Sequence, residues 1–169
     1  QEAEDMLTRI HFALDKAQGG HSSTIWFFDR ELHRQEELEN YIESHMQSAL
    51  VKEEFKLYLQ PKIRLADGSL AGAEALVRWY TSDGRMVYPN QFIPLFERNG
   101  FCIQLDYYMV EQACKQIRAW MDAGLSPIPI SVNQTKLLLY ENDYVERICS
   151  ITRRYDIPNG YITLEILEG

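Results

Sequence analysis

Apolar and polar residues alternate between residues 70 and 79, which is the pattern of a β-strand with one buried face. The apolar face comprises Ala71, Ala73, Ala75, Val77 and Trp79. The other face mixes small, large and charged residues and comprises Leu70, Gly72, Glu74, Leu76 and Arg78. The two charges of an otherwise apolar strand therefore point to the same side, opposite the face that helices are expected to cover.

The same alternation predicts three further strands, in residues 55–63, 127–133 and 161–168. The first of them forms a hairpin with the strand at 70–79, turning at Asp67-Gly68. In each strand one face is mainly apolar, and polar side chains lie late on the other. These polar residues are Gln60, Glu74 with Arg78, Asn133 and Glu165.

Helical periodicity separates the strands. Helices are predicted for residues 1–20, 31–52, 90–100, 106–122 and from about 143. A short strand is expected near residues 23–29. The helix at 31–52 is interpreted either as packed on its neighbours or as a helix that transmits signals between two domains. Strands that alternate with helices after a hairpin indicate an α/β fold with a mostly parallel sheet.

A (β/α) barrel explains why every strand has one polar face. Outward faces pack on helices, and inward side chains near the carboxyl ends of the strands line the site. Glu74, Asn133 and Glu165 supply oxygen ligands from separate strands, which suits a hard cation such as Mg²⁺ or Mn²⁺. An internal ion pair, such as Glu74 with Arg78, is the alternative explanation for charges on this face.

Composition limits the classes of function. The 169 residues are 46% hydrophobic and 25% charged, typical of a globular domain, and no apolar run is long enough to span a membrane. A net charge of −8 argues against DNA binding, which needs a basic face. Three scattered cysteines favour a reducing cytoplasm. Because the chain begins with Gln, we expect it to be part of a longer protein.

Five motifs occur in the order and approximate spacing of a known family across residues 55–168: "LQP", "EALVRW", "FIPLFERNG", "SVNQT" and "LEILE". The sequence resembles the EAL domain, the phosphodiesterase that hydrolyses cyclic di-GMP. The resemblance implies a modified TIM (β/α) barrel whose first strand is antiparallel to the rest. This chain would hold the first half of that barrel, since the family's later Asp-Asp, Lys, Glu and Gln motifs would follow residue 169.

The resemblance also implies roles for individual residues. Glu74, Asn133 and Glu165 fall at metal-ligand positions of a site for two Mg²⁺ or Mn²⁺ ions. Glu168 corresponds to a residue that steadies a catalytic loop, although Leu167 stands where the family usually has Thr or Ser. Glu74, Glu165 and Glu168 are thus the expected catalytic residues.

Three residues fall where the family contacts the dinucleotide. They are Gln60, Leu76 and Arg78, and Arg78 is expected to face phosphate. Simple filling of the barrel interior is the alternative role for Gln60 and Leu76.

Residues 11–29 resemble the last helix and strand of a GGDEF (diguanylate cyclase-like) domain. The expected organisation is therefore a GGDEF-like remnant at 1–30, a connecting helix at 31–52, and the first half of an EAL domain at 53–169. The cyclase signature loop is absent from the chain, so the resemblance does not imply cyclase activity.

The leading hypothesis is a bacterial, metal-dependent cyclic di-GMP phosphodiesterase that produces linear pGpG. A degenerate EAL domain that binds the dinucleotide or a protein partner without hydrolysis is the alternative, and another metal-dependent barrel enzyme is a third. We expect the 169 residues alone to be inactive and to dimerise through an open sheet edge. A cytoplasmic location is expected, with any membrane anchor of the parent protein outside this chain.

Overall fold

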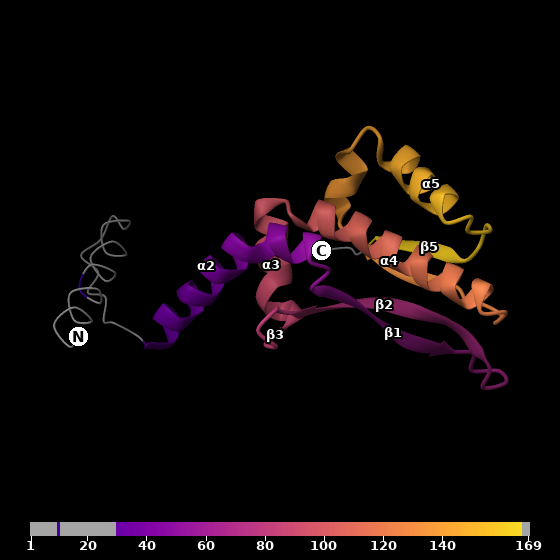
Figure 1. The fold of residues 1–169 in the computed structure, drawn as a ribbon, viewed down its shortest axis with the longest axis horizontal. Coiled ribbons are helices and arrows are strands. Elements are labelled where there is room, and N and C mark those ends of the chain that lie inside the picture. The colour runs from indigo at the N-terminus through magenta and orange to yellow at the C-terminus, as the bar shows by residue number, and fades with distance from the viewer. Residues whose placement is uncertain (1–9, 11–29, 167–169) are drawn as a thin grey trace. The chain divides into compact units, whose positions relative to one another are not determined.

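The computed structural model describes residue 10 and residues 30–166 (Figure 1). The chain divides into two compact units, residues 1–45 and 46–169. The boundary falls within helix α2 (Arg30–Val51), which matches the helix predicted at 31–52 and has no Gly or Pro to interrupt it. The GGDEF-like remnant and Glu168 lie outside the described residues, so the expectations for them stay predictions.

A twisted sheet with the strand order β1-β2-β4-β5 organises the second unit. Strands β1 (Phe55–Ile63) and β2 (Leu70–Tyr80) are antiparallel, and the short β3 (Met86–Val87) also pairs antiparallel with β2. Strands β4 (Ile130–Gln134) and β5 (Ile162–Ile166) continue the sheet in parallel. The predicted antiparallel first strand followed by parallel strands is confirmed.

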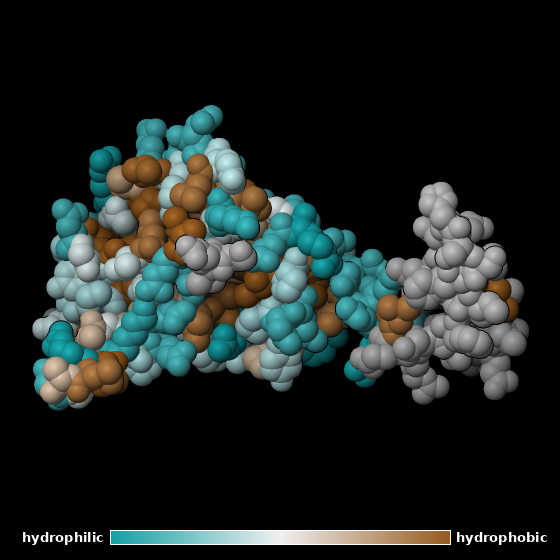
Figure 2. Space-filling model, turned by 180° about the vertical axis from the view of Figure 1, so that it is seen from behind, coloured by the Kyte–Doolittle hydropathy of each residue, from teal (hydrophilic) through white to brown (hydrophobic). Residues whose placement is uncertain are grey.

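The β1–β2 hairpin turns where the sequence predicts. Gly68 has φ +70°, and the Asp67 carboxylate accepts hydrogen bonds from the backbone N–H and the hydroxyl of Ser69. Three apolar side chains near the turn are exposed, those of Ile63, Leu65 and Leu70. Figure 2 shows a hydrophobic area, drawn in brown, at the lower left, at the hairpin end of the sheet.

Four helical segments follow the hairpin: α3 (Pro89–Asn99), α4 (Cys102–Asp122), the 3₁₀ turn η1 (Lys136–Tyr140) and α5 (Tyr144–Arg154). Helix α3 ends at Gly100, whose φ of +79° is the left-handed conformation favoured after a helix. Helix α4 contacts β1, β2, β4 and β5, and it therefore covers one face of the sheet. Among the described residues, no helix is long and apolar enough to cross a membrane.

Two boundaries differ from the sequence expectation by three residues or more. Helix α4 begins at Cys102 instead of Asp106, because buried Cys102 and Leu105 add a first turn that packs in the core. Strand β4 begins at Ile130 instead of 127, because Pro127 and Pro129 lack the N–H that a ladder needs. On α5, Ile148 and Ile151 are buried, whereas Val145, three residues before Ile148, is 70% exposed and does not contribute to the core.

An aromatic cluster forms the centre of the core on the apolar face of β2. Its members are Phe55, Trp79, Phe92, Phe96 and Phe101. The rings of Phe55 and Trp79 are 4.9 Å apart, and those of Phe96 and Phe101 are 4.6 Å apart. Each such side chain stabilises the fold by about 1.5–3 kcal/mol when buried. This packing fixes which side of β2 faces the helices, and it leaves Glu74 and Arg78 on the opposite side.

Candidate functional site

The register of the sheet brings the polar residues of four strands together. Gln60 of β1 lies opposite Glu74 of β2, and Asn133 of β4 lies beside Glu165 of β5. Paired residues of neighbouring strands project to the same face of a sheet. The sequence-predicted polar residues of β1, β2, β4 and β5 therefore share one face, opposite α4.

Glu74 and Asn133 are in direct contact. The Asn133 Nδ2 atom donates a hydrogen bond to Glu74 Oε1 over 2.8 Å. An ionised carboxylate only accepts hydrogen bonds, so the amide must turn its NH₂ toward Glu74 and its oxygen away. That oxygen, Asn133 Oδ1, is buried and has no hydrogen-bond partner in the described part of the chain. A buried oxygen without a donor is costly unless something else, such as a cation, occupies the position in front of it.

Glu165 has a different partner, which the sequence analysis did not assign to the site. Lys62 Nζ donates to Glu165 Oε1 over 2.7 Å and to the Ser131 hydroxyl over 2.6 Å. The hydrogen bond from Lys62 holds the pKa of Glu165 below its usual value. The signal for Lys62 was present in the sequence, because Lys62 has the same strand parity as Gln60.

Arg78 lies further along β2, toward its carboxyl end. Four residues along a strand span roughly 13 Å. Glu74 and Arg78 therefore do not form the internal ion pair that was the alternative to metal binding. Instead, Arg78 Nη1 donates to the carbonyl of Val77 over 2.8 Å, and its guanidinium lies 5.6 Å from the centre of the Tyr58 ring. Such a cation over an aromatic ring is held by the ring's negative face.

Aromatic and basic residues surround Arg78 at this end of the sheet. The hydroxyl groups of Tyr58 and Tyr80 are 2.9 Å apart, and their rings stack with centroids 6.3 Å apart. The hydrogen bond with Tyr58 raises the pKa of Tyr80 above its usual value. Lys56 lies directly opposite Arg78 in the strand register. Two cations and two aromatic rings thus gather where Arg78 was expected to meet phosphate.

A cavity of about 190 Å³ opens where β2 and β4 separate. The two strands pair only from Ala73 with Ile130 to Ala75 with Val132. Beyond that level the cavity is lined by residues of both strands and of α3 and α4, among them Leu76, Arg78, Asp106 and Asn133. Leu76 therefore borders an empty space. Gln60 is exposed.

Asp106 of α4 holds the segment that follows β4. Its Oδ2 atom accepts a hydrogen bond from the backbone N–H of Thr135 over 2.5 Å. Burial raises the pKa of Asp106 from 3.8 to about 7, while the hydrogen bond from Thr135 acts in the opposite direction. Asp106 was not identified from the sequence, since its burial arises only when α4 packs against β4.

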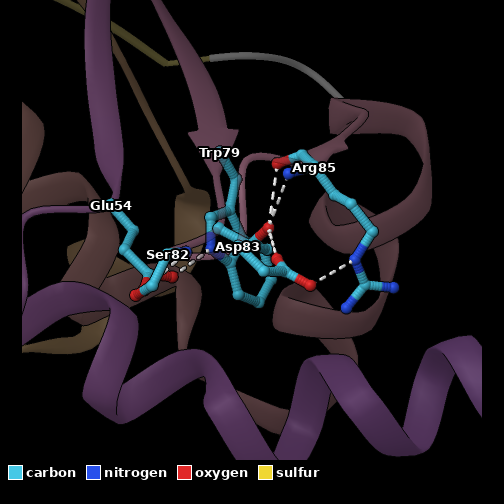
Figure 3. Close-up of polar contacts among 6 residues, drawn as sticks. Glu54, Trp79, Ser82, Asp83 and Arg85 are labelled. Carbon is cyan, nitrogen blue, oxygen red and sulfur yellow. Dashed lines mark hydrogen bonds and ion pairs between the residues drawn. The ribbon is translucent and has the colours of Figure 1, made fainter.

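Glu54 connects the end of α2 to the carboxyl end of β2 (Figure 3). Its carboxylate accepts hydrogen bonds from the Trp79 indole N–H over 3.0 Å and from the backbone N–H of Ser82 over 3.2 Å, and also from the Ser82 hydroxyl. In the same turn Arg85 Nε donates to Asp83 Oδ2 over 2.8 Å. Trp79 is adjacent to Arg78, so this network fixes the strand end that carries the guanidinium.

No cluster of three or more His, Cys, Asp or Glu residues that could hold a metal ion occurs among residues 30–166. The predicted ligand set does not require one, because it consists of two carboxylates and the Asn133 amide. Glu74 and Asn133 lie together in the structure, and Asn133 and Glu165 are register neighbours.

The sequence model of the EAL domain matches residues 43–169, which is most of the chain. The chain belongs to the EAL domain family. The match begins within α2 and includes all the strands described above. The resemblance drawn from the five motifs is confirmed.

Two curated proteins of Pseudomonas aeruginosa are similar over nearly the whole chain. The bifunctional diguanylate cyclase/cyclic di-GMP phosphodiesterase MucR is 26% identical over 95% of this chain. The cyclic di-GMP phosphodiesterase NbdA is 28% identical over 99% of it. The chain spans only 23% of MucR and 22% of NbdA, so less than a quarter of the length of either relative.

The structure of the MucR phosphodiesterase from P. aeruginosa in complex with c-di-GMP also matches. It is 29% identical, with a TM-score of 0.69, and the match covers 76% of this chain and 52% of that one. The EAL fold that was predicted from the sequence, a partial barrel with an antiparallel first strand, is therefore confirmed by both the topology and the similarity.

Proposed function

We propose that this chain forms part of a metal-dependent phosphodiesterase that hydrolyses cyclic di-GMP to linear pGpG. The unpartnered Asn133 Oδ1 atom beside Glu74 carries the proposal. It is a buried oxygen without a hydrogen-bond donor in the described part of the chain, which a cation could satisfy, and it lies on the face where a second carboxylate, Glu165, stands one strand away. The similarity to MucR and NbdA supports cyclic di-GMP as the substrate.

The residues present fit a hard divalent cation. Asn133 Nδ2 and Glu165 Oε1 are held by protein partners, and Asn133 Oδ1 is left for a ligand. Glu74 and Glu165 supply the negative charge that Mg²⁺ and Mn²⁺ require. Glu74, Asn133 and Glu165 would hold the metal. Glu168, outside the described residues, stays a predicted member of the catalytic set.

When bound, divalent ions supply acidified water and stabilise negative charge on a phosphodiester. The chain's own residues bind and orient the dinucleotide. Arg78, fixed on Tyr58, donates to a nonbridging phosphate oxygen, while Gln60 and Leu76 contact the dinucleotide beside it. Water adds to phosphorus as one P–O ester bond breaks, which leaves a phosphate on one ribose and a hydroxyl on the other.

The second candidate function is a domain that binds cyclic di-GMP or a protein without hydrolysing it. The contact between Lys62 and Glu165 favours this alternative, because the ammonium already neutralises one of the expected ligands. A site that never loads metal could be stable in this form. Metal-dependent hydrolysis is therefore the property that separates the two functions.

The test is hydrolysis of cyclic di-GMP by the full-length protein with Mg²⁺ or Mn²⁺, followed by chromatography of pGpG. We expect turnover that disappears with chelator and falls at least about a hundredfold in Glu74→Ala. The exposed Glu146→Ala on α5 is the matched control and should retain turnover. Binding of cyclic di-GMP without hydrolysis would support the second function, and unchanged turnover in Glu74→Ala would remove Glu74 from the metal site.

We also propose the domain assignment of a GGDEF-like remnant at 1–30, a connecting helix at 31–52 and an EAL domain from 53. MucR, which is a bifunctional diguanylate cyclase/cyclic di-GMP phosphodiesterase, supports the pairing. A cytoplasmic location is part of the same proposal, because the dinucleotide would be a second messenger inside bacteria.

A further inference from the structure

We propose that Lys62 is a built-in counter-cation of Glu165 that opposes divalent-metal binding and thereby sets the metal concentration at which the site loads. This inference rests on the metal site of the proposed function. The family motifs give Lys62 no role. The inference is based on the position of the Lys62 ammonium group. Lys62 Nζ lies 2.7 Å from Glu165 Oε1 and 2.6 Å from Ser131 Oγ.

The contact crosses the inner face of the sheet. Lys62 belongs to β1 and Glu165 to β5, and two strands, β2 and β4, separate them in the sheet order. Lys62 lies opposite Gly72 in the register, so no side chain on β2 stands at that level. A cavity of about 160 Å³ borders Lys62, Gly72, Ser131 and Glu165 there. The lysine side chain therefore reaches β4 and β5 past a position of β2 that has no side chain, and a Cβ at residue 72 would come within 2.8 Å of the Pro129 carbonyl oxygen.

Ser131 makes the position of the ammonium specific. Its hydroxyl accepts from Lys62 and is 3.5 Å from the carbonyl of Ala73, to which it donates. Ser131 is only 6% exposed, so this anchor is rigid. The second partner, Glu165, is one of the three predicted metal ligands. Glu74 is engaged by Asn133 instead, which leaves Glu165 as the ligand whose charge Lys62 neutralises.

A divalent ion and the ammonium would both need the Glu165 carboxylate. If Lys62 stays on Oε1, the ammonium and a divalent ion held by the same carboxylate would repel each other. If Lys62 moves away, its hydrogen bonds to Glu165 and Ser131 are lost. Either way the metal binds more weakly than it would without the ammonium. Because both side chains are about 40% exposed, solvent screens part of this effect, and we expect a change of roughly tenfold in metal affinity.

An alternative role of Lys62 predicts the opposite change in metal affinity when Lys62 is removed. If its contribution were to orient Glu165 for the metal, removal of Lys62 would weaken metal binding, as loss of a supporting residue usually does. If the pair were an ordinary surface ion pair, removal would change nothing. The direction of the affinity change therefore separates the three possibilities.

The experiment is titration of the full-length protein with Mn²⁺ by calorimetry, without substrate, for wild type, Lys62→Met and Lys62→Arg. We expect Lys62→Met to bind Mn²⁺ about tenfold more tightly and Lys62→Arg to stay within about threefold of wild type. Lys115→Met is the matched control. Lys115 pairs with Glu53 at 3.4 Å, its side chain is 42% exposed like that of Lys62, and it should leave Mn²⁺ affinity unchanged.

Equal or weaker Mn²⁺ binding by Lys62→Met overturns this inference and leaves the proposed phosphodiesterase standing. Absence of Mn²⁺ binding by both the wild type and Lys62→Met overturns both proposals. Circular dichroism checks that the variants are folded. If Lys62→Met is not folded, Lys62→Gln replaces it, because Gln keeps a polar group beside Ser131. Tighter Mn²⁺ binding than wild type then supports the inference, and equal or weaker binding overturns it.

Discussion

Asn133 of β4, which directly follows the last paired residue of its strand, donates a hydrogen bond back to Glu74 of β2, which pairs with Ser131. The last paired residues are Ala75 and Val132, and the amide bridges the strands over 2.8 Å. The contact thus ties the end of β4 to β2 where the ladder stops. It also points the unpartnered Asn133 oxygen toward the position that we assign to a cation.

Replacing Asn133 with Asp should make the protein depend on metal for stability. The new carboxylate would lie beside Glu74, and two like charges at hydrogen-bond distance repel. We expect the metal-free variant to lose about 1–3 kcal/mol of unfolding free energy, and Mn²⁺ to restore most of it. Thermal denaturation with and without Mn²⁺ measures this. Asn142→Asp, at an exposed position, is the control, and equal melting of both variants without metal would contradict the prediction.

Removal of the Tyr58 ring should weaken binding of cyclic di-GMP. The ring supports the Arg78 guanidinium 5.6 Å away, and an exposed contact of this kind contributes about 0.5–1 kcal/mol. We therefore expect Tyr58→Ala to reduce affinity about two- to fivefold, as measured by calorimetry with the full-length protein. Tyr58→Phe keeps the ring and should bind nearly as tightly. An equal loss in both variants would assign the effect to the hydroxyl and its contact with Tyr80.

Asp106 should make the protein less stable as pH rises. Burial raises its folded pKa to about 7, so between about pH 4 and 7 the folded protein retains a proton that the unfolded chain releases. The contribution of Asp106 to the free energy of unfolding is complete below the unfolded pKa of 3.8, and it is lost as pH rises through the folded pKa of about 7. The effect is on the order of 1–4 kcal/mol.

Asp106→Asn tests this directly. The amide oxygen can still accept from Thr135, but no proton is released. We expect the variant to lack the decline in stability that the wild type shows between pH 4 and 7. At pH 8 it should melt at a higher temperature than the wild type. Parallel pH profiles of the two proteins, recorded by chemical denaturation, would show that Asp106 has an ordinary pKa.

Glu54→Ala should destabilise the fold by about 1–3 kcal/mol. The substitution leaves the Trp79 indole without its acceptor at the end of β2 and frees the Ser82 turn (Figure 3). Its neighbour provides the control. Glu53 contacts Lys115 at 3.4 Å on the surface, so Glu53→Ala should change stability by less than about 0.5 kcal/mol. Urea denaturation compares the two variants, and similar midpoints would mean that the Glu54 network contributes little.

Much of the fold was predictable because the relevant information is local. The apolar alternation around Trp79 and the turn at Gly68 specified the hairpin, and Gly100 specified the end of α3. Pro127 and Pro129 could have corrected the start of β4, since neither has an N–H to donate. Val145 shows the limit of helical periodicity. Its spacing of three residues from buried Ile148 did not reveal that Val145 is 70% exposed.

The partners of the site residues depend on strand order instead. Asn133 and Glu74 are 59 residues apart, and Lys62 and Glu165 are 103 apart. Residue types and parity place them all on one face, but they do not say which side chain reaches which. Lys62 also lies opposite Gly72, which has no side chain between Lys62 and β4, and this becomes evident only from the register.

The sequence by itself determined the family, the order of the strands along the chain and the face on which Glu74, Arg78, Asn133 and Glu165 lie. Hydrophobic periodicity determines these features, because each side chain's direction follows from the backbone repeat. Only the tertiary structure decided that Asn133 turns its oxygen away from Glu74, that Lys62 neutralises Glu165, and that burial raises the pKa of Asp106. These depend on distances between strands and helices remote in sequence, and packing of the complete sheet sets those distances.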